Sequence, residues 1–243
     1  MHRLYIAASR RQQDEEVRQD AIYAAYIKDM RESLMETNDN NDKTEHQKFA
    51  RAQTLSALRQ LDSKRKTYII QFLVEAELLS TKKESIDLSG ADLDDIVLSG
   101  NIDSLYDLKS INLCNIIMTN ATFIYVDLFN TDFSGSTLTG SCFVNVFLYS
   151  TNFDNCQLSQ TYIDDIGGDL IVNIGNANLR GAIFRVLDYH LYNTILPNGS
   201  YMNSYWSIID IDHFNNENLV KNGDAEVGEC KGYISSANGP PFA

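Results

Sequence analysis

An apolar residue returns at every fifth position from residue 88 to residue 163, and this period constrains the fold more than any other feature of the chain. An α-helix presents one face every 3.6 residues and a strand every 2, so neither element keeps such a period on one side. The pattern instead requires a corner that recurs along the chain. Only Asp103 is out of step. The apolar members are Leu88, Leu93, Leu98, Leu108, Leu113, Met118, Phe123, Leu128, Phe133, Leu138, Phe143, Leu148, Phe153, Leu158 and Ile163.

Writing this series in fours, as four five-residue sides would close one coil, gives stacked columns of uniform chemistry. The predicted columns are Leu88, Leu108, Leu128 and Leu148; Leu93, Leu113, Phe133 and Phe153; Leu98, Met118, Leu138 and Leu158; and Asp103, Phe123, Phe143 and Ile163. Two residues before each large residue lies a small or β-branched one, such as Ala91, Ser136, Thr151 or Cys156. A narrow, close-packed core needs this alternation of large and small side chains. We therefore interpret Cys156 as a core residue.

Several five-residue units resemble the A(D/N)LXX unit of pentapeptide-repeat proteins: residues 86–90 (IDLSG), 91–95 (ADLDD), 121–125 (ATFIY) and 177–181 (ANLRG). The resemblance covers about residues 86–184. It implies a mainly β fold, a right-handed quadrilateral β-helix over residues 86–190. Residues 101–103 and 164–173 depart from the pattern, and we expect a loop or bulge at each.

Residues 1–85 have the composition of helices and predict a helical N-terminal segment. A first helix spans about residues 4–34 and has a polar first half, interpreted as a solvated helix end. The turn formers at 38–42 end it, a second helix presents Phe49 and Leu55 on its apolar side, and a third begins at Asp62 or Ser63. Because an open coil exposes apolar residues and unpaired strand edges, we expect these helices to cap the array.

Beyond residue 185 the pattern fades. Residues 191–217 are predicted to close the array, with an aromatic-rich strand at 201–209. Residues 218–243 form a tail, and its opening, N-L-x-x-N-G-D-x-E-x-G at 218–228, resembles the opening of jelly-roll carbohydrate-binding modules. One of the interpretations left open by this resemblance is that the tail is the start of a truncated further domain.

The net charge of −13 belongs almost wholly to the array. Residues 86–217 carry 16 acidic and 3 basic groups, whereas residues 1–85 carry 14 acidic and 15 basic groups. Such a surface disfavours direct nucleic-acid binding and suits a basic partner. No run of 18 apolar residues predicts a membrane span. Cys114, Cys142, Cys156 and Cys230 show no CxxC spacing and are interpreted as reduced thiols in a cytoplasmic setting.

No catalytic, cofactor-binding or metal-ligating residues are predicted. His2, His46, His190 and His213 are scattered, and the nearest candidate, residues 210–213, is interpreted as a solvated strand edge. The repeat itself accounts for the aspartates, since each one immediately precedes a large inward residue. These are Asp87, Asp92, Asp107, Asp127 and Asp132.

The leading hypothesis is a non-enzymatic scaffold without cofactors that binds a still unidentified protein. The resemblance implies two alternatives. One is an acidic rod that mimics DNA and binds a DNA-processing enzyme such as gyrase, although those relatives usually dimerise through a C-terminal helix and this chain carries its helices at the N-terminus. The other is the soluble part of a protein anchored in a membrane by a segment encoded upstream. The sequence sets no oligomeric state.

Overall fold

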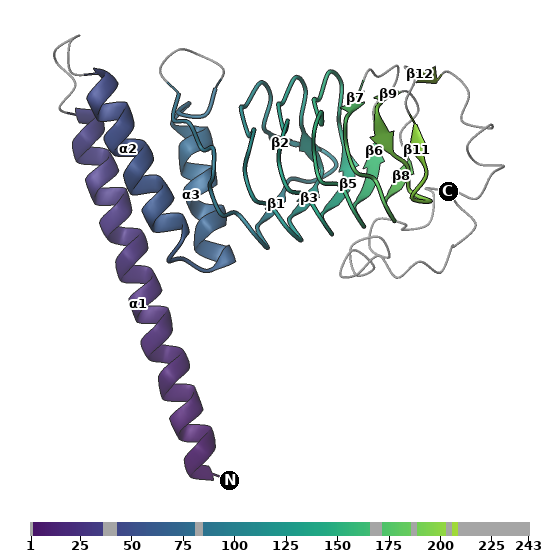
Figure 1. Ribbon diagram of the computed structural model, residues 1–243. Helices are drawn as coiled ribbons and strands as arrows, with labels where there is room; N and C mark the ends of the chain where they lie inside the picture. Colours follow the sequence, from purple (N-terminus) through teal and green to yellow (C-terminus); the bar gives the residue numbers. More distant parts are fainter. Residues whose placement is uncertain are drawn as a thin grey trace. The chain divides into compact units, whose positions relative to one another are not determined.

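The computed structural model describes residues 2–35, 43–80, 85–165, 172–185, 189–202 and 206–208. They belong to two units, Met1–Asp87 and Leu88–Ala243. The first contains three helices and the second is a β-solenoid (Figure 1). The turn expected at 38–42, the strand edge at 210–213 and the tail at 218–243 lie outside the described residues. Capping of the array by the helices stays a prediction.

The helical unit consists of α1 (His2–Met35), α2 (Lys43–Leu58) and α3 (Ser63–Glu75). Figure 1 shows α1 extending well past one end of α2. The helices bury Met30, Leu58, Ile69 and Leu73 among other side chains. Asp62 is the N-cap of α3, as expected, and accepts a hydrogen bond from the backbone N–H of Arg65. Phe49 was expected on the apolar side of its helix, but it is 55% exposed.

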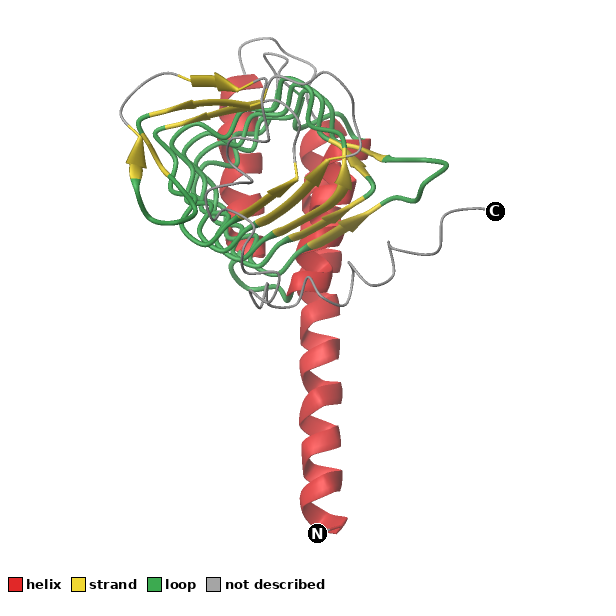
Figure 2. Ribbon diagram, turned by 90° about the vertical axis from the view of Figure 1, so that its right-hand side faces the viewer, coloured by secondary structure: helices red, strands yellow, loops and turns green. Residues whose placement is uncertain are grey.

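The solenoid is built from short strands that stack in parallel, one from each successive coil. One side of the coils is a sheet in the order β1 (Val97–Ser99), β3 (Thr122–Ile124), β5 (Cys142–Val146), β6 (Tyr162–Asp165) and β8 (Ile183–Arg185). Another side pairs β2 (Tyr106–Asp107) with β4 (Val126–Asp127). Figure 2 looks along the direction in which the coils stack, so that strands of the same side lie one behind another. The expected β-helix with three helices at the N-terminus is confirmed.

The core of the solenoid contains columns of fully buried side chains. In two columns the phenyl rings are nearly parallel: Phe123 and Phe143 have centroids 4.6 Å apart, and Phe133 and Phe153 5.2 Å apart. Between the columns the rings meet edge to face, as for Phe133 and Phe143 at 5.9 Å. Both geometries are favourable for aromatic pairs. The aromatic columns therefore hold adjacent sides and successive coils together.

The small inward residues form hydrogen bonds to the backbone of the preceding coil. Thr131, Ser136, Ser141, Thr151 and Thr161 each donate a hydroxyl hydrogen bond to a backbone carbonyl 23 residues earlier, in the preceding coil. Ser136 and Ser141 also accept hydrogen bonds from the backbone N–H groups of Ile116 and Ala121. Buried hydroxyls are thus tolerated because they have partners.

Corners follow from two local features of each five-residue unit. Asp92, Asp107, Asp127 and Asp132 accept hydrogen bonds from the backbone N–H two residues later, which is the Asx-turn geometry. The residue at the corner then has positive φ, which Asn and Gly tolerate best. Corner residues with positive φ include Gly90, Asp95, Ser110, Asn115, Asn120, Tyr125, Asn130, Gly135, Gly140, Asn145, Ser150, Asn155, Gln160, Asn176 and Gly181.

The column assignment of the first coil was wrong. Leu98 pairs with Phe123, at a separation of 25 residues, whereas later coils repeat after 20. In the same register Leu93 stacks with Met118 and Leu88 with Leu113, as the parallel bridge from Asp92 to Ile117 shows. These leucines belong one column later than predicted.

The cause is a surface loop at residues 101–105. Asn101 and Ser104 form an antiparallel bridge, and the Asn101 side chain accepts hydrogen bonds from the N–H groups of Asp103 and Ser104. Ile102 at the tip is 71% exposed. Gly100 starts the loop in a position where a Cβ would lie 2.4 Å from the Tyr106 nitrogen. Asp103 is therefore a loop residue and occupies no column; a loop was expected here, and this is confirmed.

The second expected break changes the register by one residue. Asn152 bridges Asn173 and Tyr162 pairs with Ile183, so that the separation becomes 21. The predicted shift before Ile174 is confirmed, whereas residues 166–171 lie outside the described residues. Parallel pairing continues as far as the bridge between Asn178 and Ile195.

Antiparallel strands follow the last described coil. β7 (Val172–Gly175) pairs in parallel with β9 (Tyr189–Tyr192), and β9 pairs antiparallel with β12 (Trp206–Ile208). β10 (Thr194–Ile195) pairs antiparallel with β11 (Tyr201–Met202). The aromatic segment at 201–209 thus contains two short strands rather than the single strand expected. Antiparallel pairing covers strand edges that another chain could otherwise extend.

Deleting residues 101–105 should leave the solenoid folded. The deletion joins Gly100 to Tyr106, restores a regular coil, and should change the free energy of unfolding by less than about 1 kcal/mol, because shortening a surface loop alters little but closure entropy. The matched control deletes Asn130 alone. That single deletion turns inward residues outward and should destabilise the protein far more. Circular dichroism on heating compares the two variants, and an unfolded 101–105 deletion would contradict the loop assignment.

Candidate interaction surfaces

The outer surface of the described coils is acidic. Residues 88–165 contain ten aspartates and one basic residue, Lys109. The Nζ atom of Lys109 lies 3.2 Å from an Asp127 carboxylate oxygen and 3.7 Å from one of Asp107. The hydrogen bond to Asp127 raises the pKa of Lys109. Lys109 is therefore already engaged by carboxylates, and the surrounding surface keeps its negative charge.

Several of these carboxylates hold neighbouring coils together. Asp94 accepts a hydrogen bond from the Thr119 N–H at 2.6 Å. Asp154 accepts from the Gly175 N–H at 2.6 Å and from the Tyr192 hydroxyl at 2.7 Å. A Cβ on Gly175 would lie 1.9 Å from the Tyr192 ring, so glycine is needed for the ring to pack here. Asp94 and Asp154, which follow rather than precede a large inward residue, thus have structural partners as well.

An exposed aromatic pair lies on the same outer surface. Phe129 and Tyr149 follow Lys109 at intervals of 20 residues and occupy one outward column. Their rings are nearly parallel with centroids 5.5 Å apart, and they remain 38% and 39% exposed. Sequence reasoning missed this pair; aligning the residue after each large inward one would have found it. Aromatic residues are enriched in protein interfaces.

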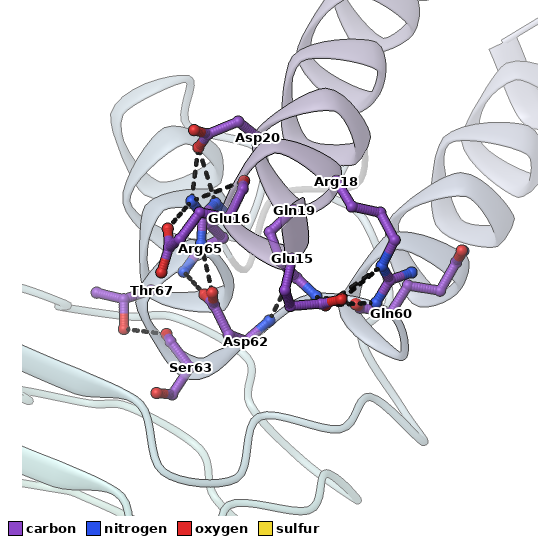
Figure 3. A network of polar contacts seen from close by, with 10 residues as sticks. All are labelled: Glu15, Glu16, Arg18, Gln19, Asp20, Gln60, Asp62, Ser63, Arg65 and Thr67. Carbon is purple, nitrogen blue, oxygen red and sulfur yellow. Dashed lines mark hydrogen bonds and ion pairs between the residues drawn. The ribbon is translucent and has the colours of Figure 1, made fainter. Parts of the chain in front are cut away.

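The helical unit contains a buried arginine held by carboxylates from two helices (Figure 3). The Arg65 side chain is 3% exposed and forms ion pairs with Glu16 at 2.6 Å, with Asp20 at 2.7 Å and with Asp62. The hydrogen bond to Glu16 is the main reason why the pKa of Arg65 is raised. The guanidinium charge is compensated on three sides, so the cluster is a structural link between α1 and α3 and offers no free acid or base.

The polar first half of α1 is therefore not only a solvated helix end. Gln19 donates to the Gln60 carbonyl at 3.1 Å and accepts from the Asp62 N–H at 2.9 Å. Glu15 accepts from Arg18 and Gln19, and these bonds lower the pKa of Glu15 to about 2. Residues 8–18 are exposed, as expected of a solvated helix end, whereas Gln19 is buried because its partners lie more than 40 residues away in the sequence.

Replacing Arg65 with Met should destabilise the helical unit by about 2 kcal/mol, because three carboxylates lose a charged hydrogen-bond donor. Arg18→Met is the matched control: its ion pair with Glu15 is exposed and should contribute less than about 1 kcal/mol. Native-state hydrogen exchange of amides in α1 and α3 reports on this unit alone. If the amides of α1 and α3 were equally protected from exchange in the two variants, the structural role of Arg65 would be contradicted.

A hollow of about 360 Å³ lies against α1 and α2. Its lining residues are Ile22, Tyr26, Asp29, Ala52, Gln53, Ser56, Ala57 and Gln60. A serine nucleophile needs a base such as histidine or lysine, and neither type is among these residues. The hollow provides no activated nucleophile.

The cysteines differ in their surroundings. Cys156 is fully buried, donates to the Phe133 carbonyl, and burial raises its pKa to about 12. Cys114 is half-buried and outside any disulfide. Cys142 is disulfide-bonded. The expectation of reduced thiols throughout is therefore wrong for Cys142, because sequence spacing does not show which cysteines meet in space.

In the unreduced native protein at pH 8, a maleimide should label Cys114 and leave Cys156 unlabelled. The Cys156 thiol is protonated at this pH and has no access to the reagent, whereas the thiolate is the reactive form. Peptide mass spectrometry after labelling measures both sites. Unfolding in denaturant should make Cys156 reactive; labelling of Cys156 at the same rate in the native protein would show that it is not in the core.

Among the described residues no three histidine, cysteine, aspartate or glutamate side chains are placed to hold a metal ion. His46 and His190 lie in α2 and β9. None of the described helices combines the length and apolar character that a bilayer crossing requires.

Comparison with known proteins identifies the repeats. Residues 107–135 and 131–165 match the family model for pentapeptide repeats, with eight copies. A search of curated proteins gives no match.

Solved structures similar to this chain include two that are described as pentapeptide-repeat proteins. One, from the thylakoid lumen of Arabidopsis thaliana, is 22% identical over 45% of this chain and 61% of its own, with a TM-score of 0.21. HetL, involved in heterocyst differentiation regulation in the cyanobacterium Nostoc, is 19% identical over 47% and 54%, with a TM-score of 0.18. QnrB1, a plasmid-mediated fluoroquinolone resistance protein, is 16% identical over 55% and 81%, with a TM-score of 0.21. The match spans less than two thirds of the first two proteins.

Proposed function

We propose that this chain, which carries pentapeptide repeats, is a non-enzymatic scaffold that binds a basic surface of another protein through the outer faces of its coils. The observation that carries the proposal is the division of side chains between the inside and the outside of the coils. The inward hydroxyls and Cys156 bond to carbonyls of the preceding coil, whereas the outer surface of residues 88–164 holds nine aspartates and one lysine.

The coil architecture supports binding rather than catalysis. Ladders of backbone hydrogen bonds and stacked rings fix each coil on the previous one, so outward side chains are held on a rigid framework. A rigid surface loses little conformational entropy when a partner docks. Charge of one sign speeds encounter with an oppositely charged partner and is weakened by salt.

Gyrase is the specific alternative partner, favoured by the excess of aspartate over lysine on the coils. A negatively charged rod of this kind competes with DNA for a basic groove and does not itself bind nucleic acid. Excess chain should then inhibit supercoiling by purified gyrase. Unchanged supercoiling removes this alternative and leaves the broader scaffold proposal standing. A cytoplasmic location and an anchor encoded upstream stay predictions.

Photo-crosslinking from an outward position tests the proposal. A photoreactive amino acid at Ile117, which is 43% exposed on the face next to Asp92, should capture a discrete basic protein from native extract. The matched control carries the same group at Leu138, which is fully buried. Capture should fall several-fold in Asp94→Asn/Asp95→Asn and in about 0.5 M salt, where screening is strong. Capture unaffected by both changes would contradict a charge-driven interface.

A further inference from the structure

The side of the coils that contains β2 and β4 carries two outward ladders of side chains. In the first ladder Asp107 pairs with Asp127, and Asp127 bridges Phe147 in the following coil. This ladder is therefore acidic at β2 and aromatic two coils later. The second ladder lies two residues further along each five-residue unit and consists of Lys109, Phe129 and Tyr149.

The aromatic end of this side stays open to solvent. Phe129 and Tyr149 are 38% and 39% exposed although their rings stack with centroids 5.5 Å apart, and Phe147 in the neighbouring ladder is half-buried. Stacking covers one face of each ring, so the edges of the two rings are left open next to each other. Ring edges carry partial positive charge and attract the face of another aromatic ring. An aromatic side chain of a partner that lies across both edges therefore gains two edge-to-face contacts.

The acidic end leaves one carboxylate accessible. The Nζ atom of Lys109 lies 3.2 Å from a carboxylate oxygen of Asp127, whose side chain is 14% exposed. It lies 3.7 Å from a carboxylate oxygen of Asp107, whose side chain is 67% exposed. Two carboxylates less one ammonium leave one net negative charge at this end. Asp107 is thus the group that can pair with a further cation from outside.

The backbone fixes the rings and their distance from Asp107. The Ser110 N–H donates to the Phe129 carbonyl at 2.8 Å, and the Asn130 N–H donates to the Tyr149 carbonyl at 2.9 Å. Neighbouring strands lie about 4.8 Å apart, which places Asp107 about 8 Å from Phe129 on the diagonal. Alternate residues of an extended peptide are about 7 Å apart and point the same way. A peptide with the sequence pattern aromatic-x-basic therefore matches the spacing of the two ends.

We propose that this side of the coils binds an extended segment of a partner protein with the pattern aromatic-x-basic. The tryptophan or tyrosine of the segment lies across the edges of Phe129 and Tyr149, and its arginine or lysine pairs with Asp107. This inference rests on the proposed function, because it names the chemistry by which the basic partner is recognised. It adds an aromatic anchor to the attraction of charges, and such anchors supply much of the binding energy in protein interfaces.

Fluorescence anisotropy with a labelled peptide, Ser-Trp-Ser-Arg-Ser-Arg, tests the proposal on the full chain. Phe129→Ala/Tyr149→Ala should weaken binding about tenfold, as expected for the loss of an anchoring contact. Asp107→Asn should weaken binding several-fold and reduce its dependence on salt. The matched control is Ile117→Ala, which shortens an exposed apolar side chain two sides of the coil away and should leave binding unchanged. Circular dichroism checks that all variants are folded.

A second peptide with alanine in place of tryptophan separates this inference from the proposed function. It should bind about tenfold more weakly than the tryptophan peptide. Equal binding of the two peptides, or full binding of the tryptophan peptide by Phe129→Ala/Tyr149→Ala, would overturn the aromatic anchor and leave charge-driven binding standing. If neither peptide bound at about 1 mM, where even weak contacts are populated, the site itself would be overturned. Capture from Ile117 would still decide the scaffold proposal in that case.

Discussion

Phe133→Ala should destabilise the solenoid by about 3–5 kcal/mol, because it removes a large buried ring and leaves a cavity. Phe133 is fully buried and contacts three other phenyl rings, those of Phe123, Phe143 and Phe153. Its loss therefore weakens two columns at once. Urea unfolding followed by circular dichroism measures the change in free energy.

Phe129→Ala is the matched control, since Phe129 lies in the same coil but is 38% exposed. It loses only its stacking on Tyr149, and a change below about 1 kcal/mol is expected. Similar losses for the two variants would mean that the inward and outward assignments of these phenylalanines are wrong.

Leu128→Asp should unfold the solenoid or lower its stability by about 4 kcal/mol or more. A carboxylate at this position would be buried among apolar columns, without the cation or hydrogen-bond donors that compensate a buried charge. Leu128 is fully buried. Because each coil is stabilised mainly by its neighbours, damage in a central coil spreads to those on both sides.

Asn130→Asp introduces the same charge two residues later and serves as the control. Asn130 is an exposed corner with φ of 56°, a conformation that aspartate also tolerates. Its effect should stay below about 0.5 kcal/mol. A melting temperature unchanged by Leu128→Asp would contradict the assignment of this residue to the core.

Most of the solenoid core could be predicted from sequence because the period of five maps directly onto geometry. Leu108, Phe133 and Met118 lie in the columns that the pattern assigned to them. The aspartates at the turn positions were correctly attributed to the repeat. Here the local rule and the global fold require the same residues, so the sequence reports both.

The first coil could not be placed from periodicity alone. The loop at 101–105 is as long as one side of a coil. Inserting it leaves the phase of the apolar series unchanged and only shifts which column each leucine joins. A loop whose length is not a multiple of five would have broken the phase and revealed itself. Pairing between coils, which is not visible in a single sequence, decides the matter.

Contacts between distant parts of the chain were likewise beyond sequence reasoning. Glu16 and Arg65 are 49 residues apart, and each alone has the character of a solvated surface residue. Likewise, spacing gave no sign that Cys142 is disulfide-bonded while Cys114 and Cys156 are not. Candidate interaction surfaces depend on such contacts, which explains why the core was predicted better than the outside.

The register of the coils is the claim on which the assignment of every inward and outward residue rests, and paired pyrene labels test it most directly. In a chain whose four natural cysteines are replaced by serine, Asp92→Cys is combined with Ile117→Cys in one variant and with Asn112→Cys in another. Asp92 and Ile117 form a parallel bridge, so their pyrenes should give strong excimer fluorescence, whereas the pair 92 and 112 should give monomer emission. Excimer emission from 92 and 112 instead would contradict the loop at 101–105 and the outward surfaces derived from it.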